Sequence, residues 1–168
     1  MFDNVDYVGI RVTVVKPSLM SVGYKYSGVN VGPADPVQWM NAAEVAFLKA
    51  EASAVFGFNM GGSAEEFYNE GIRLSFSQWG ISGADSYLAN DELKLGAYQD
   101  PGNSSNSYST PLTDVTVKWD EAADVEKKQE RIIIQKWIAN FNLGNEAWAD
   151  HRRTGYPKFF PASDEGNM

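Results

Sequence analysis

The sequence predicts a mainly α-helical protein, built on helix pairs with a few short strands and long loops. Segments 37–56 and 121–142 carry apolar residues at helical spacing along their length. Segment 63–79 follows the first of them after a short glycine-rich turn, as the second helix of a hairpin does. With 168 residues and a 43% hydrophobic composition, we expect a single domain with a substantial core.

Charge and composition exclude several function classes. The net charge of −8 argues against nucleic-acid binding, which needs a basic surface, and against docking on an anionic membrane. The absence of cysteine removes thiol nucleophiles, disulfides and thiolate metal sites. No run of 18 apolar residues is present, so we expect no membrane-spanning helix.

The first 36 residues predict strand and loop. Residues 7–15 alternate between apolar and polar side chains, which indicates a half-buried strand. Glycine and proline punctuate residues 16–36, where VGYKYSGV could form a second short strand.

Segment 37–79 predicts a helix hairpin. Most of the circumference of helix 37–56 is apolar, so we expect this helix to be sandwiched between others. Ser63 and Glu66 form a capping-box pattern at the start of helix 63–79. Gly71 is unfavourable inside a helix, and we expect it to allow close approach of the first helix. The hairpin has the size of a TPR-like unit, although the TPR consensus is not matched position by position.

The remaining elements are an irregular region, 80–119, and the C-terminal helices, 120–161. In the irregular region we expect a short helix in GADSYLAN and a short strand in TDVTVKW, 113–119. Helix 121–142 has an acidic first turn, and a shorter helix in EAWADHRRTGYP has its basic residues last, as helix dipoles favour. Gly155 is expected just beyond the end of that last helix.

Three stretches together resemble a known family. AAEVAFLKAEAS at 42–53, AEEFYNEGIRLSFSQWG at 64–80 and ERIIIQKWIANFNLGNEAWADHRRTGYPKFFP at 130–161 are similar to the C-terminal portion of the SusD/RagB outer-membrane nutrient-binding lipoproteins. The resemblance covers roughly residues 37–161. It implies part of a SusD-like α superhelical fold of TPR-like helix pairs.

The resemblance also implies a function. Members of the family are not enzymes; they are lipid-anchored at the cell surface and capture oligosaccharides for a TonB-dependent, SusC-like transporter. The family's long N-terminal half and lipobox cysteine are not found in this sequence. We therefore expect a C-terminal fragment, with membrane attachment only through a lipid anchor on an N-terminal part, and no cofactor or nucleic acid.

Candidate ligand-binding residues are rings and amides of the irregular region. A sugar can pack its CH face on an aromatic ring while neighbouring amides bind its hydroxyls. Trp79 and Trp119 are expected in the core instead. The predicted site residues are Tyr87, Tyr98, Tyr108, Asn103 and Asn106, with Asp100 as a further hydrogen-bonding group.

Several alternatives remain beside this interpretation. The chain could be a TPR-like protein-interaction scaffold without a ligand site of its own. A glycosidase would need two facing carboxylates, and the polar loop near Asn103 could hold calcium, but both signals are weak. Trp148, Arg152 and Arg153 could contact a carboxylate or a transporter. We favour instead that one arginine pairs with Glu44 or Glu51, because a buried acid needs a partner.

Overall fold

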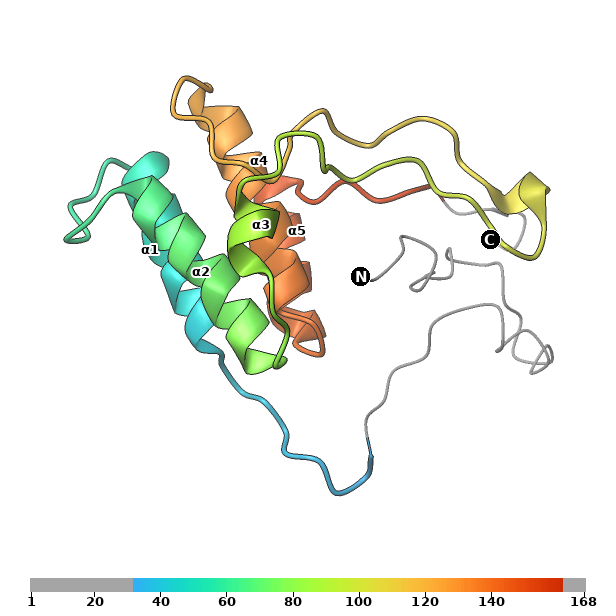
Figure 1. The fold of residues 1–168 in the computed structure, drawn as a ribbon, viewed down its shortest axis with the longest axis horizontal. Coiled ribbons are helices and arrows are strands. Elements are labelled where there is room, and N and C mark those ends of the chain that lie inside the picture. Colours follow the sequence, from blue (N-terminus) through green and yellow to red (C-terminus); the bar gives the residue numbers. More distant parts are fainter. Residues whose placement is uncertain (1–31, 162–168) are drawn as a thin grey trace. The chain divides into compact units, whose positions relative to one another are not determined.

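The computed structural model describes residues 32–161 and is mainly helical (Figure 1). Two compact units divide the chain. The helical unit comprises Val37–Leu95 and Thr113–Lys158, and the loop unit contributes the described residues 32–36, 96–112 and 159–161. The helices are α1 (Ala42–Ala54), α2 (Ala64–Gln78), α3 (Ala84–Leu88), the 3₁₀ turn η2 (Ser104–Asn106), α4 (Val125–Ala139) and α5 (Gly144–Thr154). No helix in residues 32–161 is both long and apolar enough to traverse a bilayer.

Helices α1 and α2 pack side by side as the predicted hairpin (Figure 1). The capping box of α2 is present: the Ser63 side chain accepts from the Glu66 amide, and the Glu66 carboxylate accepts from the Ser63 amide. Gly71 faces the ring of Phe47 so closely that an added Cβ would lie 2.7 Å from its Cζ. The predicted close approach of the two helices at this glycine is therefore confirmed.

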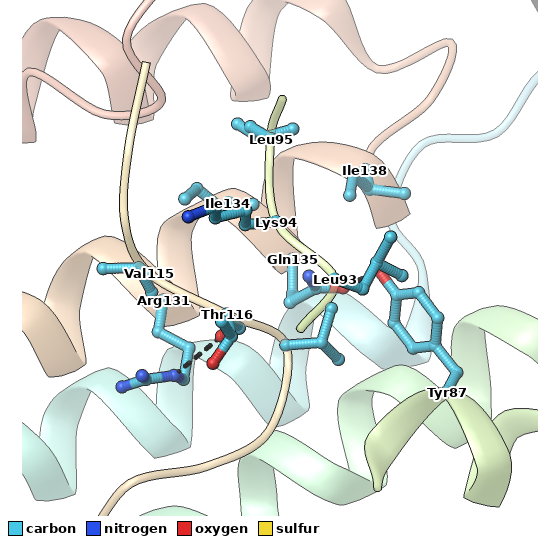
Figure 2. Close-up of a pocket in the computed structure, with 11 residues that line it drawn as sticks. Tyr87, Leu93, Lys94, Leu95, Val115, Thr116, Arg131, Ile134, Gln135 and Ile138 are labelled. Atoms are coloured by element: carbon cyan, nitrogen blue, oxygen red, sulfur yellow. Dashed lines mark hydrogen bonds between the residues drawn. The ribbon is translucent and has the colours of Figure 1, made fainter. Parts of the chain in front are cut away.

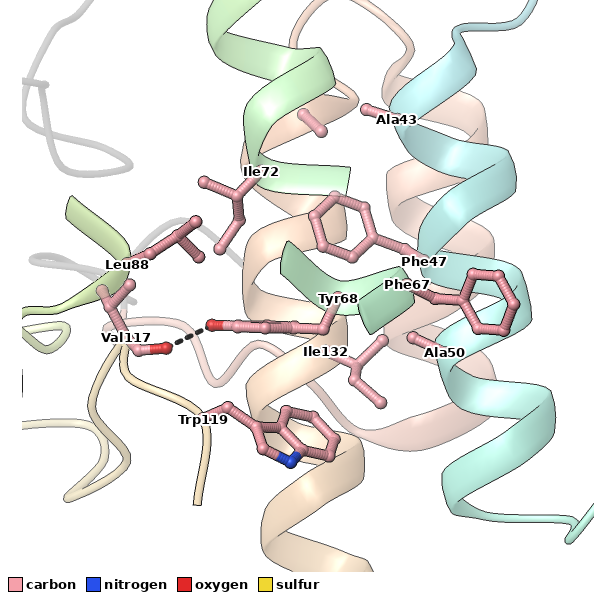
Figure 3. Packing of buried hydrophobic residues seen from close by; sticks show 11 residues of the cluster. Ala43, Phe47, Ala50, Phe67, Tyr68, Ile72, Leu88, Val117, Trp119 and Ile132 are labelled. Carbon is pink, nitrogen blue, oxygen red and sulfur yellow. Dashed lines mark hydrogen bonds between the residues drawn. The ribbon is translucent and has the colours of Figure 1, made fainter. Parts of the chain in front are cut away.

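Helix α1 is sandwiched, since it also packs against α4. The core between these helices contains the fully buried side chains of Phe47, Tyr68 and Ile132 (Figure 3). The Tyr68 hydroxyl donates to the carbonyl of Val117, which fixes the 115–119 segment against the helices. Trp119, which packs on Tyr68 with ring centroids 5.2 Å apart, is buried as predicted.

Three sequence predictions need correction. The first helix begins at Ala42, not 37, because the Asn41 side chain caps it, and Met40 before the cap is 68% exposed. Trp79 is not a core residue: it lies at the end of α2, 42% exposed, with its ring against Phe141. The strand expected at 113–119 is absent, because this segment pairs with its neighbour only through an isolated bridge between Lys94 and Thr116.

The other helical predictions agree with the structure more closely. The short helix at GADSYLAN is α3, and the last helix ends at Gly155 in a left-handed conformation. The long helix expected at 121–142 is shorter, since Asp124 caps α4 and residues 121–123 form a turn before it. The strands expected at 7–15 and 22–29 lie outside the described residues.

A buried network of charges ties α5 to α1 and α4. The Arg153 guanidinium makes a bidentate pair with the Glu51 carboxylate and also bonds Asp150 at 2.9 Å. Lys136, on α4, lies 2.8 Å from Asp150 and 3.6 Å from Glu44. The predicted pairing of one arginine with an acid of the first helix is confirmed. The same contacts engage Glu44 and Glu51, which leaves neither as a free catalytic carboxylate.

Candidate binding sites

The loop unit brings two predicted site residues together. Tyr98 and Tyr108 face each other across an antiparallel bridge, with N···O distances of 2.9 and 2.8 Å in its two backbone hydrogen bonds. Both rings also pack on Phe160, with centroids 5.9 Å away for Tyr98 and 5.4 Å for Tyr108. Each tyrosine is half-buried.

The turn between these tyrosines is organised by Asp100. One carboxylate oxygen accepts from the amides of Gly102 and Asn103, and the other accepts from the Tyr98 hydroxyl at 3.0 Å. Asp100 is only 9% exposed, so its role is to hold the turn and the Tyr98 ring rather than to offer a carboxylate to a ligand. The expectation that Asp100 binds sugar hydroxyls is not supported by this geometry.

The two predicted asparagines lie in the same turn. The Asn103 side-chain oxygen accepts from the Ser105 amide, which starts η2, while the residue as a whole is exposed. Asn106 is the last residue of η2 and is half-buried. The structure therefore gathers Tyr98, Tyr108, Asn103 and Asn106 on one short hairpin-like excursion of the chain.

Tyr87 belongs to the helical unit, where it lines a cavity of about 160 Å³ (Figure 2). Its hydroxyl donates to the Gln135 side-chain oxygen at 3.0 Å, and burial raises the pKa of the phenol. The ring packs against Phe76, with 5.3 Å between centroids. Only part of Tyr87 is therefore available to a ligand in the cavity.

The cavity lies between α4 and the two chain segments joined by the Lys94–Thr116 bridge (Figure 2). Leu93, Ile134 and Ile138 supply apolar walls. Two cationic side chains, Arg131 and Lys94, also line it, and no acidic side chain of the described residues does. This charge pattern is unusual for a chain whose net charge is −8.

Arg131 is buried in this cavity wall without a counter-ion among the described residues. The residue is 5% exposed, and its Nε donates to the Thr116 carbonyl at 3.0 Å. Its Nη1 is shielded and makes no hydrogen bond, and within residues 32–161 no carboxylate lies within salt-bridge distance. Sequence reasoning missed this residue. The signal was an arginine directly before three isoleucines, a position where the helix must be buried.

Other polar clusters carry less chemistry. No group of three His, Cys, Asp or Glu side chains in the described part of the chain is arranged to hold a metal ion. The lone His151 stacks on Trp148 and its Nδ1 lies 2.9 Å from the Pro157 carbonyl oxygen. Both contacts fix the end of α5 and suggest no catalytic role.

The chain was compared with known proteins. A family model described as SusD-like, "Susd and RagB outer membrane lipoprotein", matches residues 2–168. A SusD homologue of Bacteroides uniformis is 58% identical, with a TM-score of 0.83 over 90% of this chain and 31% of that one. A Bacteroides thetaiotaomicron homologue is 42% identical, with a TM-score of 0.82 over 93% and 33%.

A third solved structure is a chitin-binding SusD homologue from Flavobacterium johnsoniae, 53% identical, with a TM-score of 0.69 over 74% of this chain and 25% of that one. No curated protein matches the chain. The chain spans about a third or less of the length of these solved relatives. With a family model that matches nearly every residue, the chain belongs to the SusD-like family of SusD and RagB outer-membrane lipoproteins.

Proposed function

We propose that this protein is a non-enzymatic, glycan-binding component of an outer-membrane uptake system of the SusC/SusD type. It captures oligosaccharides at the cell surface and delivers them to a TonB-dependent transporter. The observation that carries the proposal is the 53% identity to a chitin-binding SusD homologue over 74% of the chain. Membership in a family of outer-membrane lipoproteins supports the same location, with attachment through a lipid anchor.

Binding is assigned to the half-buried rings and the amides of the loop unit. The Tyr98 and Tyr108 rings, fixed by Phe160 and by the Asp100 turn, offer rigid apolar surface for the CH face of a sugar. The amides of Asn103 and Asn106 lie in the same excursion and supply hydrogen bonds to hydroxyls. Tyr87, in the helical unit, is proposed separately as a ring that a sugar can contact. No covalent bond is broken in this process.

Affinity electrophoresis against a panel of neutral polysaccharides, chitin derivatives included, tests the proposal. The protein should be retarded in at least one gel, and Tyr108→Ala should reduce the retardation while Tyr108→Phe, which keeps the ring, should not. Trp148→Ala is the matched control, because it removes an exposed ring (55%) from α5, a helix that carries none of the assigned residues. Unchanged mobility on every polysaccharide contradicts glycan binding, and release of reducing sugar contradicts the non-enzymatic role.

A second candidate function is a TPR-like protein-interaction scaffold without its own ligand site. It is favoured by apolar side chains that α1 leaves at the surface, Val45 at 40% and Leu48 at 44% exposed. Co-purification with a TonB-dependent outer-membrane transporter from the same genome tests this role. Replacing Val45 and Leu48 by glutamine should abolish the association.

A further inference from the structure

The cavity of the helical unit combines cationic and apolar walls, as described above. Arg131 is nine-tenths buried, carries a permanent charge and has no ion pair within residues 32–161. Another buried cation of the helical unit is paired, because Lys136 lies beside two carboxylates. A buried cation without a counter-ion is costly, and an anion in the cavity would offset that cost.

The second cation restricts the ligand further. Lys94 lines the same cavity from the opposite chain segment, the one that bridges to Thr116. No acidic side chain of residues 32–161 lines the cavity, and Asp114, whose pKa is lowered by its hydrogen bond with Lys127 and also by Lys94, lies outside the lining. Two positive side chains in the lining therefore favour a negatively charged group. Arg131 offers only part of its guanidinium to a ligand, because Nε donates to the Thr116 carbonyl and Nη1 is shielded. A carboxylate suits the remaining N–H groups, since charge-assisted hydrogen bonds to an ionised oxygen are stronger than neutral ones.

The other residues that line the cavity indicate what kind of molecule carries the carboxylate. Leu93, Ile134 and Ile138 form an apolar wall, and Tyr87, Gln135 and Thr116 place hydroxyl and amide groups beside it (Figure 2). A sugar ring has the same mixture of CH faces and hydroxyls. The volume, about 160 Å³, limits the occupant to a single small residue.

We propose that this cavity binds the uronic acid residue of an acidic glycan, with the carboxylate held by Arg131 and Lys94. The inference rests on the proposed glycan-binding function and narrows its substrate class. It also adds a site apart from the tyrosines of the loop unit, in which Tyr87 is the one residue that sequence reasoning had already named.

An NMR titration of the ¹⁵N-labelled protein with sodium D-galacturonate tests the proposal. The Arg131 Nε–H and the amides of Lys94 and Leu95 should shift with added ligand. The methyl ester of galacturonate, which loses the charge and gains one methyl group, should bind at least tenfold more weakly, since a hydrogen bond to a charged group is worth that factor or more. Equal affinity for acid and ester, or shifts confined to other residues, would overturn the proposal.

Variants give an independent test. Arg131→Gln should weaken galacturonate binding tenfold or more, and Lys94→Gln, whose side chain is exposed, by a smaller factor. Arg73→Gln is the matched control, since it removes an arginine that is exposed and already paired with Asp85, and it should bind as the parent protein does. Unchanged affinity in Arg131→Gln contradicts the assignment. If Arg131→Gln does not fold, the acid–ester comparison on the parent protein still decides.

The two proposals fail separately. Absence of retardation on neutral polysaccharides contradicts the assignment of a glycan site to the loop-unit tyrosines. It leaves the galacturonate shifts at Arg131 intact. Absence of those shifts contradicts the cavity assignment and leaves neutral-glycan binding, tested with Tyr108→Ala, unaffected.

Discussion

Gly71 shows how one missing side chain sets the distance between two helices. The Phe47 ring occupies the space in which a Cβ would stand, 2.7 Å from the nearest ring atom. Gly71→Ala should therefore lower the free energy of unfolding by about 1–3 kcal/mol through overpacking, although alanine is the better helix former. Urea denaturation measures the effect.

Gly144→Ala is the control for Gly71→Ala. Gly144 lies in the first turn of α5, and a Cβ there would meet no atom within 4 Å. The control should be as stable as the parent protein or slightly more stable, because alanine favours the helix. A Gly71→Ala protein of unchanged stability would mean that Phe47 moves aside at no cost.

Tyr156 predicts a pH dependence at alkaline pH. Its hydroxyl donates to the Glu126 carboxylate at 2.6 Å, and this hydrogen bond, with burial and nearby acids, raises the pKa of Tyr156 to about 12. The unfolded phenol has a pKa of about 10. The folded state thus holds this proton more tightly, so the stability that Tyr156 contributes is complete below pH 10 and is lost as the pH rises towards 12.

Comparison with Tyr156→Phe isolates this contribution, because the lysines titrate alike in both proteins. The parent protein should be the more stable one at pH 8, and the difference in unfolding free energy should shrink between pH 10 and 12. A difference that stays constant across this range would show that the hydrogen bond to Glu126 does not control the proton.

At the scale of elements, the cap of α1 also joins two helices. The Asn41 side-chain oxygen accepts from the Glu44 amide, and its amide group donates to the Ala139 carbonyl and the Asn140 side chain at the end of α4. Asn41→Ala should cost about 2–4 kcal/mol, since a cap and two buried hydrogen bonds are lost together.

Asp124→Ala tests whether Asn41→Ala loses more stability than the removal of an ordinary helix cap. The difference would come from the hydrogen bonds by which Asn41 links two helices. Asp124 caps α4 through the Lys127 amide and is exposed. Its loss should cost about 1 kcal/mol, the ordinary value of a cap. Equal costs for Asn41→Ala and Asp124→Ala in urea denaturation would contradict a role of Asn41 in joining α1 to α4.

Local signals explain which elements could be predicted from the sequence. The capping box at Ser63, the glycine at position 71 and the dipole-ordered charges of α5 each act within one or two turns, so sequence spacing is enough to find them. The segment 113–119 alternates like a strand, but a strand also needs a partner, and Lys94–Thr116 is the only bridge it makes among the described residues. Tertiary pairing decides this element.

The candidate sites also divide into one marked by local sequence signals and one that depends on tertiary packing. Loop composition is enough to propose Tyr98 and Tyr108 as site residues, which stays a prediction, while the Arg131 cavity requires α4 to meet two segments distant in sequence. Trp79 was misplaced because its stripe on α2 extends beyond the part of the helix that other elements cover. Burial at a helix end depends on neighbours that periodicity does not specify.

At the scale of the whole molecule, α5 joins residues 102 positions apart. Arg153 holds Glu51 of α1 and Asp150 of its own helix, and Asp150 in turn contacts Lys136 of α4. Glu51 is 3% exposed, so without Arg153 its carboxylate would keep, within residues 32–161, only the hydrogen bond from Gln129. These contacts hold the C-terminal helix to the hairpin and to α4 at once.

Arg153→Met should therefore destabilise the entire helical unit. We expect a loss of about 2–3 kcal/mol, below the 3–5 kcal/mol of a fully buried pair, because the Arg153 side chain is 43% exposed. Arg152→Met is a closely matched control: the neighbouring arginine is exposed and makes no ion pair with any described residue, so its loss should change stability by at most about 0.5 kcal/mol. Because one network links three helices, unfolding followed by circular dichroism and by tryptophan fluorescence should shift together in Arg153→Met. Transitions that separate would show that α5 detaches alone and that the network does not unite the fold.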